Sequence, residues 1–361
     1  MFKNSFWMLV SLAGCISTPK EDVRFEEVGF KITADIKYAS KFYFEKDDSS
    51  EYIVVSEPWP GAITEKRYPI GKAPLRVVCT STSHLPFFEL LGMEEVVVGF
   101  PNLSLVSSEV FRARAENGYL TDLGPDGNMN MELLLSLNPD AVVAFDMGGE
   151  SNTLDKIAEV GIPVFHNSDF LETSPLGRAE WIKFFGALLD KRAEADSIFK
   201  HIEKEYLRLK DIGENAGEKP TVLSGVVYGD TWFLPGGKNW SSAFFKNAGG
   251  EYLWEKDTAS GWLELSFEAV YEVANDADYW IGTSTLNTKD EMVGQDGRYG
   301  SFNSFKNNQV FSYNKRLGPQ GGYDFFESGY SRPDLVLADL ISILHPESLP
   351  NYATVYFQKL K

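Results

Sequence analysis

Residues 179–213 read AEWIKFFGALLDKRAEADSIFKHIEKEYLRLKDIG, a stretch near the middle of the chain that decides its fold. It has no proline and no glycine between Ala187 and Ile212. Its apolar side chains recur at spacings of three and four residues, which is typical of one amphipathic helix. At ~1.5 Å per residue, a helix over residues 187–213 extends ~40 Å, enough to cross from one domain to another.

Short apolar strands alternate with helical patterns on both sides of this stretch. In residues 75–100, for example, the strand-like LRVVC and EEVVVGF flank the helix-like HLPFFELLG. Strands that alternate with helices indicate parallel sheets with crossover helices. The sequence therefore predicts an α/β fold of two Rossmann-like lobes, residues 73–186 and 214–361, joined by one long rigid helix over residues 187–213.

The N-terminal part of the chain has a different composition. Residues 1–15, MFKNSFWMLVSLAGC, have a lysine ahead of an apolar run too short to span a bilayer, which is typical of an export signal. The run ends in Leu-Ala-Gly-Cys, which resembles the lipobox of bacterial lipoproteins, so lipidation is predicted at Cys15. Residues 16–72 are predicted to be a tether and a β-rich extension, because KFYFEKDDSSEYIVVS alternates aromatic and polar residues around a turn signal.

Composition and motifs exclude several functions. A formal net charge of −18 argues against a nucleic-acid partner. The chain has four histidines, too few in suitable loops for a bare metal-ion site, so no metal is predicted. No nucleophile elbow and no phosphate-binding loop is present. The chain is therefore predicted to be a monomeric binding protein without a cofactor, not an enzyme.

One sequence pattern occurs twice. Residues 129–145, MNMELLLSLNPDAVVAF, and residues 265–281, LSFEAVYEVANDADYWI, both run from a small polar residue into a short helix with a glutamate in its first turn, then into a strand. The glutamates are Glu132 and Glu268. Each glutamate could simply interact favourably with the dipole of its own helix. A matched pair, one in each lobe, indicates a shared role.

With these two similar segments and a single interlobe helix, the chain resembles the substrate-binding lipoproteins of ABC importers for iron complexes and cobalamin. These are the helical-backbone (class III) periplasmic binding proteins. The resemblance covers residues 74 to about 345. In that family a glutamate from each lobe forms salt bridges with arginines of the permease, so the resemblance implies docking roles for Glu132 and Glu268. It also implies a ligand, itself containing iron or cobalt, held between the lobes.

Ligand contacts are expected in the loops that follow the predicted strands, because ligands of α/β sheets bind beyond the carboxyl ends of the strands. These loops are rich in aromatic residues, as large flat ligands require. Trp262 lies where cobalamin binders also carry a tryptophan. The predicted ligand-binding residues are His84, Phe145, Trp232, Trp240, Trp262, Arg316, Tyr323, Asp324, Phe325 and Phe326.

The predicted function is capture of a metal chelate (cobalamin or another corrinoid, a ferric siderophore, or haem) and its delivery to an ABC importer permease. The predicted location is the periplasmic side of a bacterial membrane, with surface exposure left open. One alternative is a scavenging or sensory surface lipoprotein on the same scaffold with no permease partner. A further alternative, an enzyme acting on the chelate, has no supporting group of residues.

Overall fold

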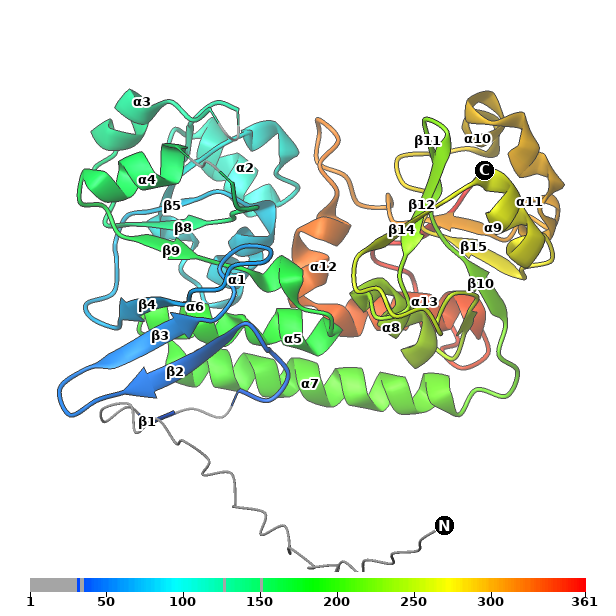
Figure 1. The fold of residues 1–361 in the computed structure, drawn as a ribbon, viewed down its shortest axis with the longest axis horizontal. Coiled ribbons are helices and arrows are strands. Elements are labelled where there is room, and N and C mark those ends of the chain that lie inside the picture. Colours follow the sequence, from blue (N-terminus) through cyan, green and yellow to red (C-terminus); the bar gives the residue numbers. More distant parts are fainter. Residues whose placement is uncertain (1–30, 33–35, 126–127, 150–151) are drawn as a thin grey trace, which may run out of the picture.

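The computed structural model of this chain describes residues 31–32, 36–125, 128–149 and 152–361. The prediction at Cys15 lies outside the described residues. Two α/β lobes lie along one long helix, α7 (Arg192–Glu214), as Figure 1 shows. None of the helices in these ranges combines the length and the apolar character needed to span a membrane. The predicted two-lobed α/β fold is confirmed.

The N-terminal lobe contains a five-stranded, fully parallel sheet in the order β7-β6-β5-β8-β9. Helices cover both faces of this sheet, so its central strands are buried and almost entirely apolar. The strands are β5 (Val77–Cys79), β6 (Val97–Phe100), β7 (Thr121–Asp122), β8 (Ala141–Ala144) and β9 (Val164–His166). The helices are α1 (Leu85–Leu90), α2 (Glu109–Glu116), α3 (Met131–Ser136), α4 (Asn152–Glu159), α5 (Pro175–Glu180) and α6 (Ile182–Leu188).

The C-terminal lobe contains a second five-stranded sheet, in the order β13-β10-β15-β16-β17. Four of its strands are parallel, and only the edge strand β17 runs antiparallel to its neighbour. The strands are β10 (Thr221–Leu223), β13 (Glu251–Tyr252), β15 (Tyr279–Ile281), β16 (Val310–Ser312) and β17 (Gln358–Lys359). The helices are α8 (Trp240–Asn247), α9 (Phe267–Ala274), α10 (Lys289–Gln295), α11 (Asn303–Lys306), α12 (Ser328–Ser331) and α13 (Pro333–Leu344).

A small antiparallel sheet, which the sequence did not indicate, extends the C-terminal lobe. It consists of β11 (Val226–Tyr228), β12 (Thr231–Pro235) and β14 (Trp262–Leu265), in that order. Residues 221–228 read as one strand, but Gly225 adopts φ +80° and divides it into β10 and β11. A Cβ atom at Gly225 would lie 1.9 Å from the carbonyl oxygen of Phe233, so only glycine fits this bend.

Helix α7 contributes side chains to the cores of both lobes. Phe199 and Ile202 belong to the core of the N-terminal lobe, whereas Tyr206 and Leu209 belong to the core of the C-terminal lobe. Helix α6 packs on its first half and α13 on its second. Bending α7 would open both cores, so this helix is a rigid connector between the lobes.

The predicted start of the connecting helix at residue 187 is wrong. Helix α6 ends at Leu188, Asp190 adopts a left-handed conformation with φ 57°, and α7 begins at Arg192. Gly186 allows this sharp turn, since a Cβ atom there would lie 2.5 Å from Cβ of Ala195. The apolar periodicity continues across the break, so periodicity alone could not show it.

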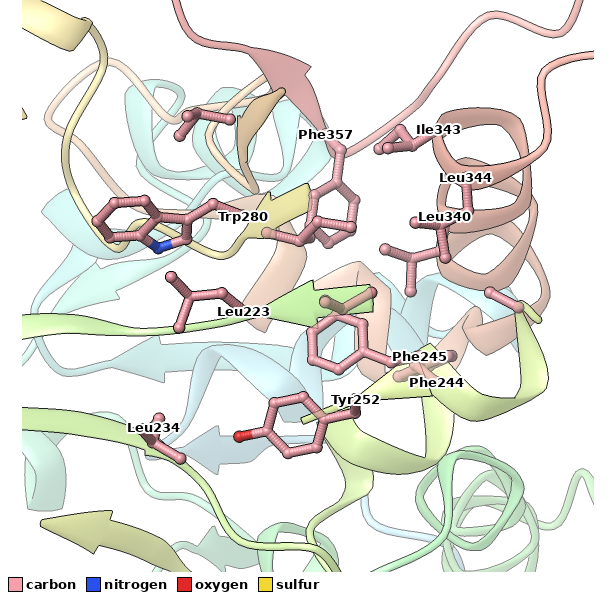
Figure 2. Close-up of a cluster of buried hydrophobic side chains, with 14 of the residues drawn as sticks. Leu223, Leu234, Phe244, Phe245, Tyr252, Trp280, Leu340, Ile343, Leu344 and Phe357 are labelled. Carbon is pink, nitrogen blue, oxygen red and sulfur yellow. The ribbon is translucent and has the colours of Figure 1, made fainter. Parts of the chain in front are cut away.

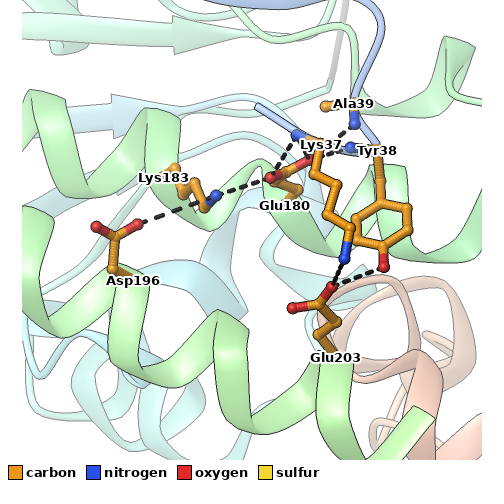
Figure 3. Close-up of polar contacts among 7 residues, drawn as sticks. All are labelled: Lys37, Tyr38, Ala39, Glu180, Lys183, Asp196 and Glu203. Atoms are coloured by element: carbon orange, nitrogen blue, oxygen red, sulfur yellow. Dashed lines mark hydrogen bonds and ion pairs between the residues drawn. The ribbon is translucent and has the colours of Figure 1, made fainter. Parts of the chain in front are cut away.

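The N-terminal extension is a four-stranded antiparallel sheet of β1 (Lys31–Ile32), β2 (Phe42–Lys46), β3 (Glu51–Val55) and β4 (Lys66–Pro69). It is β-rich, as predicted, and it packs into the core of the N-terminal lobe through Phe42, Phe44 and Ile53. The chain that leads into β2 wraps over a buried carboxylate, that of Glu180, which accepts hydrogen bonds from the backbone N–H groups of Lys37, Tyr38 and Ala39 at 2.6–3.0 Å (Figure 3).

The core of the C-terminal lobe lies between its main sheet and helices α8 and α13. Figure 2 shows Phe244 and Phe245 of α8, Leu340 of α13, and Phe357 near β17, which approach the same interior from different elements. Trp280 of β15 is fully buried on this sheet.

Candidate functional site

A cavity of ≈ 570 Å³ opens at the carboxyl ends of the strands of the C-terminal sheet. Its walls include the residues that follow β10 (Ser224 and Gly225), β15 (Gly282 and Ser284) and β16 (Tyr313). This is the edge of the sheet where α/β folds bind ligands, and the volume lies within the range of about 300–1,000 Å³ of small-molecule sites. The cavity is therefore the candidate ligand site, although all of its lining residues belong to the C-terminal lobe.

Two aromatic side chains that line this cavity are open to solvent. Trp262 of β14 is 58% exposed and Tyr228, at the turn between β11 and β12, is 81% exposed. Large aromatic groups at such exposure lose hydrophobic stabilisation that a ligand could restore. The small antiparallel sheet thus places two aromatic side chains where an incoming ligand would meet them.

The structure brings four of the predicted ligand-binding residues together. Trp240, Trp262, Phe325 and Phe326 all line the cavity. Tyr323 lies beside it, with its ring 5.8 Å from the ring of Tyr313. Phe325 and Tyr313 stack at 4.9 Å with an interplanar angle of 13°, and so form a continuous aromatic wall.

Trp232 and His84, both predicted to bind ligand, are buried in the cores of their lobes and do not line the cavity. Trp232 is fully buried, stacks on Trp280 at 5.3 Å and donates a hydrogen bond from Nε1 to the carbonyl of Ser224. Its strand β12 is covered by α9 and the short helices around Tyr299, so its side chain points into the core. His84 is also fully buried, beside Phe185, and burial lowers its pKa to about 3, which keeps the ring neutral.

Phe145 lies in the other lobe. It follows β8 at the carboxyl edge of the N-terminal sheet, and its ring is 4.6 Å from that of Phe170. Its backbone N–H donates to Oγ1 of Thr80 at 2.8 Å. The side chain is partly buried and does not line the cavity of the C-terminal lobe.

The lobes touch through a segment that runs from Arg316 to Glu327. The carboxylate of Glu327 accepts hydrogen bonds from the backbone N–H groups of Ser107 at 2.7 Å and Ser108 at 2.9 Å, and Oγ of Ser107 donates to the carbonyl of Gly322 at 2.9 Å. A Cβ atom at position 322 would lie 1.8 Å from the carbonyl oxygen of Leu105. Glycine there lets two backbones from different lobes meet.

This interlobe contact is electrostatically unusual, because three carboxyl groups meet one cation. Burial, together with the neighbouring charges of Asp324 and Glu89, raises the pKa of Glu327 to about 7. Burial likewise raises the pKa of Glu89. The predicted residues Arg316 and Asp324 pair with one another, Nε to Oδ2 at 3.1 Å, at this same contact. Arg316 and Asp324 therefore belong to the segment that joins the lobes and do not line the cavity.

Arg178 of α5 also links the two lobes. Its guanidinium lies 4.3 Å from the ring centroid of Trp240 and 4.2 Å from that of Tyr330. Its Nη2 donates to the carbonyl of Phe170 at 2.8 Å. A buried cation between two aromatic faces is a strong contact, so Arg178 helps to fix the ring of Trp240.

The matched glutamates lie in equivalent positions. Asn130 and Ser266 cap α3 and α9, accepting hydrogen bonds from the backbone N–H groups of Leu133 at 3.0 Å and Ala269 at 3.2 Å. Glu132 and Glu268 therefore occupy the first turn of each helix, and both are exposed. Helices α3 and α9 lie on the side of the molecule opposite α7 (Figure 1).

The two glutamates differ in one respect. The side chain of Glu268 is 77% exposed and pairs with Nη1 of Arg298 at 3.2 Å. An ion pair this exposed is weak because water screens it, so a partner could replace it at little cost.

Sequence reasoning missed Tyr228 and Tyr313 as lining residues. Tyr313 directly follows β16, so the rule that ligands bind beyond the carboxyl ends of strands could have identified it. Tyr228 belongs to the turn of a hairpin that the sequence did not reveal. Among the described residues, no group of three or more His, Cys, Asp or Glu side chains is placed to hold a metal ion.

Two α/β lobes on one rigid helix, with an aromatic cavity at the carboxyl ends of the strands of the C-terminal lobe, define a two-lobed substrate-binding receptor. Comparison with known families gives the same result, because residues 77–317, more than half of the chain, match the model of the periplasmic binding protein family. The chain belongs to this family. Its members are substrate-binding transport proteins and not enzymes.

Relatives and solved structures agree with this assignment. An uncharacterised lipoprotein of Methanocaldococcus jannaschii is 26% identical over 84% of this chain and 74% of its own length. A vitamin B12-binding protein of Vibrio parahaemolyticus is 21% identical over 60% of this chain and 75% of its own length. Among solved structures, a periplasmic haem-binding protein of Pseudomonas aeruginosa has the same fold, with a TM-score of 0.60 and 20% identity over 80% of this chain and 98% of that one.

Proposed function

We propose that this protein is an exported lipoprotein that binds a metal chelate (a corrinoid, a ferric siderophore or haem) between its lobes and delivers it to an ABC importer permease. The observation that carries the proposal is the matched pair of exposed carboxylates, one on the first turn of α3 and one on the first turn of α9. Two oriented carboxylates far apart can fix a receptor over two guanidinium groups of a permease.

The cavity supports the chelate as ligand. Its rim carries Tyr228 and Trp262, and its walls carry Trp240, Tyr313 and Phe325, so a large ligand in the cleft would meet aromatic surface where the cavity opens. A relative named as a vitamin B12-binding protein and a structural neighbour named as haem-binding support this class of ligand.

The mechanism that follows requires no chemistry. Because α7 belongs to both cores, the lobes can change their separation only slightly. The contacts that could change include those between residues 105–108 and residues 316–327, where a few hydrogen bonds join the lobes. Docking would separate this contact and release the ligand to the permease. Exposed ion pairs at the docking face would give orientation more than affinity.

Charge reversal at the docking face tests the proposal. In the Glu132→Lys, Glu268→Lys double variant, transport by membranes that contain the cognate permease should fall at least tenfold, because both contacts become repulsive. Chelate affinity in solution should stay the same. Glu272→Lys, an exposed residue of α9 outside the matched pair, is the control and should transport normally. Unchanged transport by the double variant would show that the protein is a scavenger or sensor that does not use this docking face.

A further inference from the structure

The cavity reaches from the edge of the sheet to the hydrophobic core of the C-terminal lobe. Its inner end is lined by side chains of α8, α13 and the C-terminal segment, which are Phe244, Phe245, Val336, Leu340 and Phe357. Figure 2 shows four of these side chains, Phe244, Phe245, Leu340 and Phe357, around the lobe's interior. These residues are 1–4% exposed, so the inner end of the cavity is closed by core side chains.

The lining contains no lysine, arginine, histidine, aspartate or glutamate. Its polar side chains are few, and one of them is already engaged, since Nε2 of Gln295 donates to the carbonyl of Val227 at 2.5 Å. A charged group inside would lose its hydration without gaining a partner, which is strongly unfavourable. An apolar group of matching size would gain from leaving water.

The charged groups of the lobe contact lie outside this cavity. Arg316 and Asp324 do not line it, and the Arg316 side chain is 57% exposed. The site therefore has a polar part, at the contact between the lobes, and an apolar part within the C-terminal lobe. The exposed rings of Tyr228 and Trp262 belong to the apolar part.

We propose that the C-terminal cavity is a subsite for an uncharged apolar appendage, aliphatic or aromatic, carried by the ligand. The inference deepens the proposed function and rests on it: the cargo is an amphipathic chelate whose polar, metal-bearing part stays in the cleft while its apolar group enters the C-terminal lobe. Each methylene group that enters should strengthen binding about fourfold.

The subsite can be tested first without the natural ligand. N-phenyl-1-naphthylamine, an uncharged dye that fluoresces in apolar surroundings, should bind the wild-type chain at one saturable site. Ser241→Trp places a large ring into the cavity from a partly exposed position, and Phe326→Asp places a charge on its wall. Both variants should weaken dye binding at least tenfold. Leu207→Asp, the same kind of change at a residue of α7 that is 42% exposed and outside the lining, should leave dye binding unchanged.

The second measurement uses a ferric trihydroxamate in N-acetyl, N-hexanoyl and N-decanoyl forms, which share charge and metal. Affinity should rise along this series for the wild type and stay flat for Ser241→Trp. If the N-acetyl form binds and longer chains bring no gain, the subsite is refuted while the chelate function stands. If no ferric complex binds but the dye binds and Ser241→Trp abolishes dye binding, the apolar subsite is supported and ferric trihydroxamates are excluded as the cargo. Absence of dye binding by the wild type refutes the subsite.

Discussion

Glu327 should make the stability of this protein depend on pH in a specific direction. Its carboxyl group is 1% exposed at the contact between the lobes, and its pKa of about 7 lies above the ordinary value of 4.5. A carboxyl group whose folded pKa is raised contributes most to stability below its unfolded pKa. That contribution is lost as pH rises from about 4.5 towards 7. A shift of this size corresponds to about 3 kcal/mol.

The substitution that isolates this effect is Glu327→Gln. The amide carries no charge at any pH, and its oxygen can still accept a hydrogen bond from the Ser107 or Ser108 N–H. Relative to the wild type, the free energy of unfolding of the variant should therefore increase by about 3 kcal/mol between pH 4.5 and pH 8. In thermal unfolding of a chain of this length, this is a relative gain of roughly 4 °C.

Urea denaturation and differential scanning calorimetry at a series of pH values measure this difference directly. The control is Glu109→Gln, which removes an exposed carboxylate in the first turn of α2, close in sequence to Ser108. Its unfolding profile should run parallel to that of the wild type. Parallel profiles for wild type and Glu327→Gln would refute the reasoning, because they would show that the pKa of Glu327 is the same in the folded and unfolded chain.

Two further substitutions test how the fold is held together. Glu180→Ala removes the acceptor shared by the N–H groups of residues 37–39, so it should lower the free energy of unfolding by about 3 kcal/mol and speed proteolysis of the N-terminal extension. Glu203→Ala, which removes only the partly exposed contact to the Lys37 and Tyr38 side chains, should lower the free energy of unfolding much less than Glu180→Ala does. Gly322→Ala should separate the backbones that meet between the lobes and shift the lobe separation seen by small-angle scattering, whereas Gly300→Ala, where a Cβ atom meets nothing within 4 Å, should not.

The architecture could be predicted because its signals are local and repeated. Alternating strands and helices specify parallel sheets, and the capped starts at Asn130 and Ser266 are as the sequence indicated. Two departures have backbone causes that periodicity does not report. The left-handed residue Asp190 ends α6 and delays the start of α7, and the left-handed Gly225 turns the chain from the main sheet into the small antiparallel sheet.

The site was less predictable, because burial of an aromatic side chain depends on which face of its element meets the core. Trp232 and Trp262 lie on neighbouring strands, β12 and β14, yet Trp232 is fully buried and Trp262 is 58% exposed. No local pattern distinguishes them. The interlobe bonds of Glu327 join residues about 220 positions apart, and only the folded chain brings them together.

The central claim, capture of a metal chelate, is tested most directly by titrating the soluble chain that begins after Cys15 with cyanocobalamin, haemin and a panel of ferric siderophores. Quenching of tryptophan fluorescence and the visible spectra of the ligands would report binding. The account predicts saturable, submicromolar binding of one chelate class, weakened at least tenfold in Trp262→Ala, because Trp262 is at the rim of the cavity. If none of these chelates binds, the claim is contradicted, and the receptor carries a different class of small molecule.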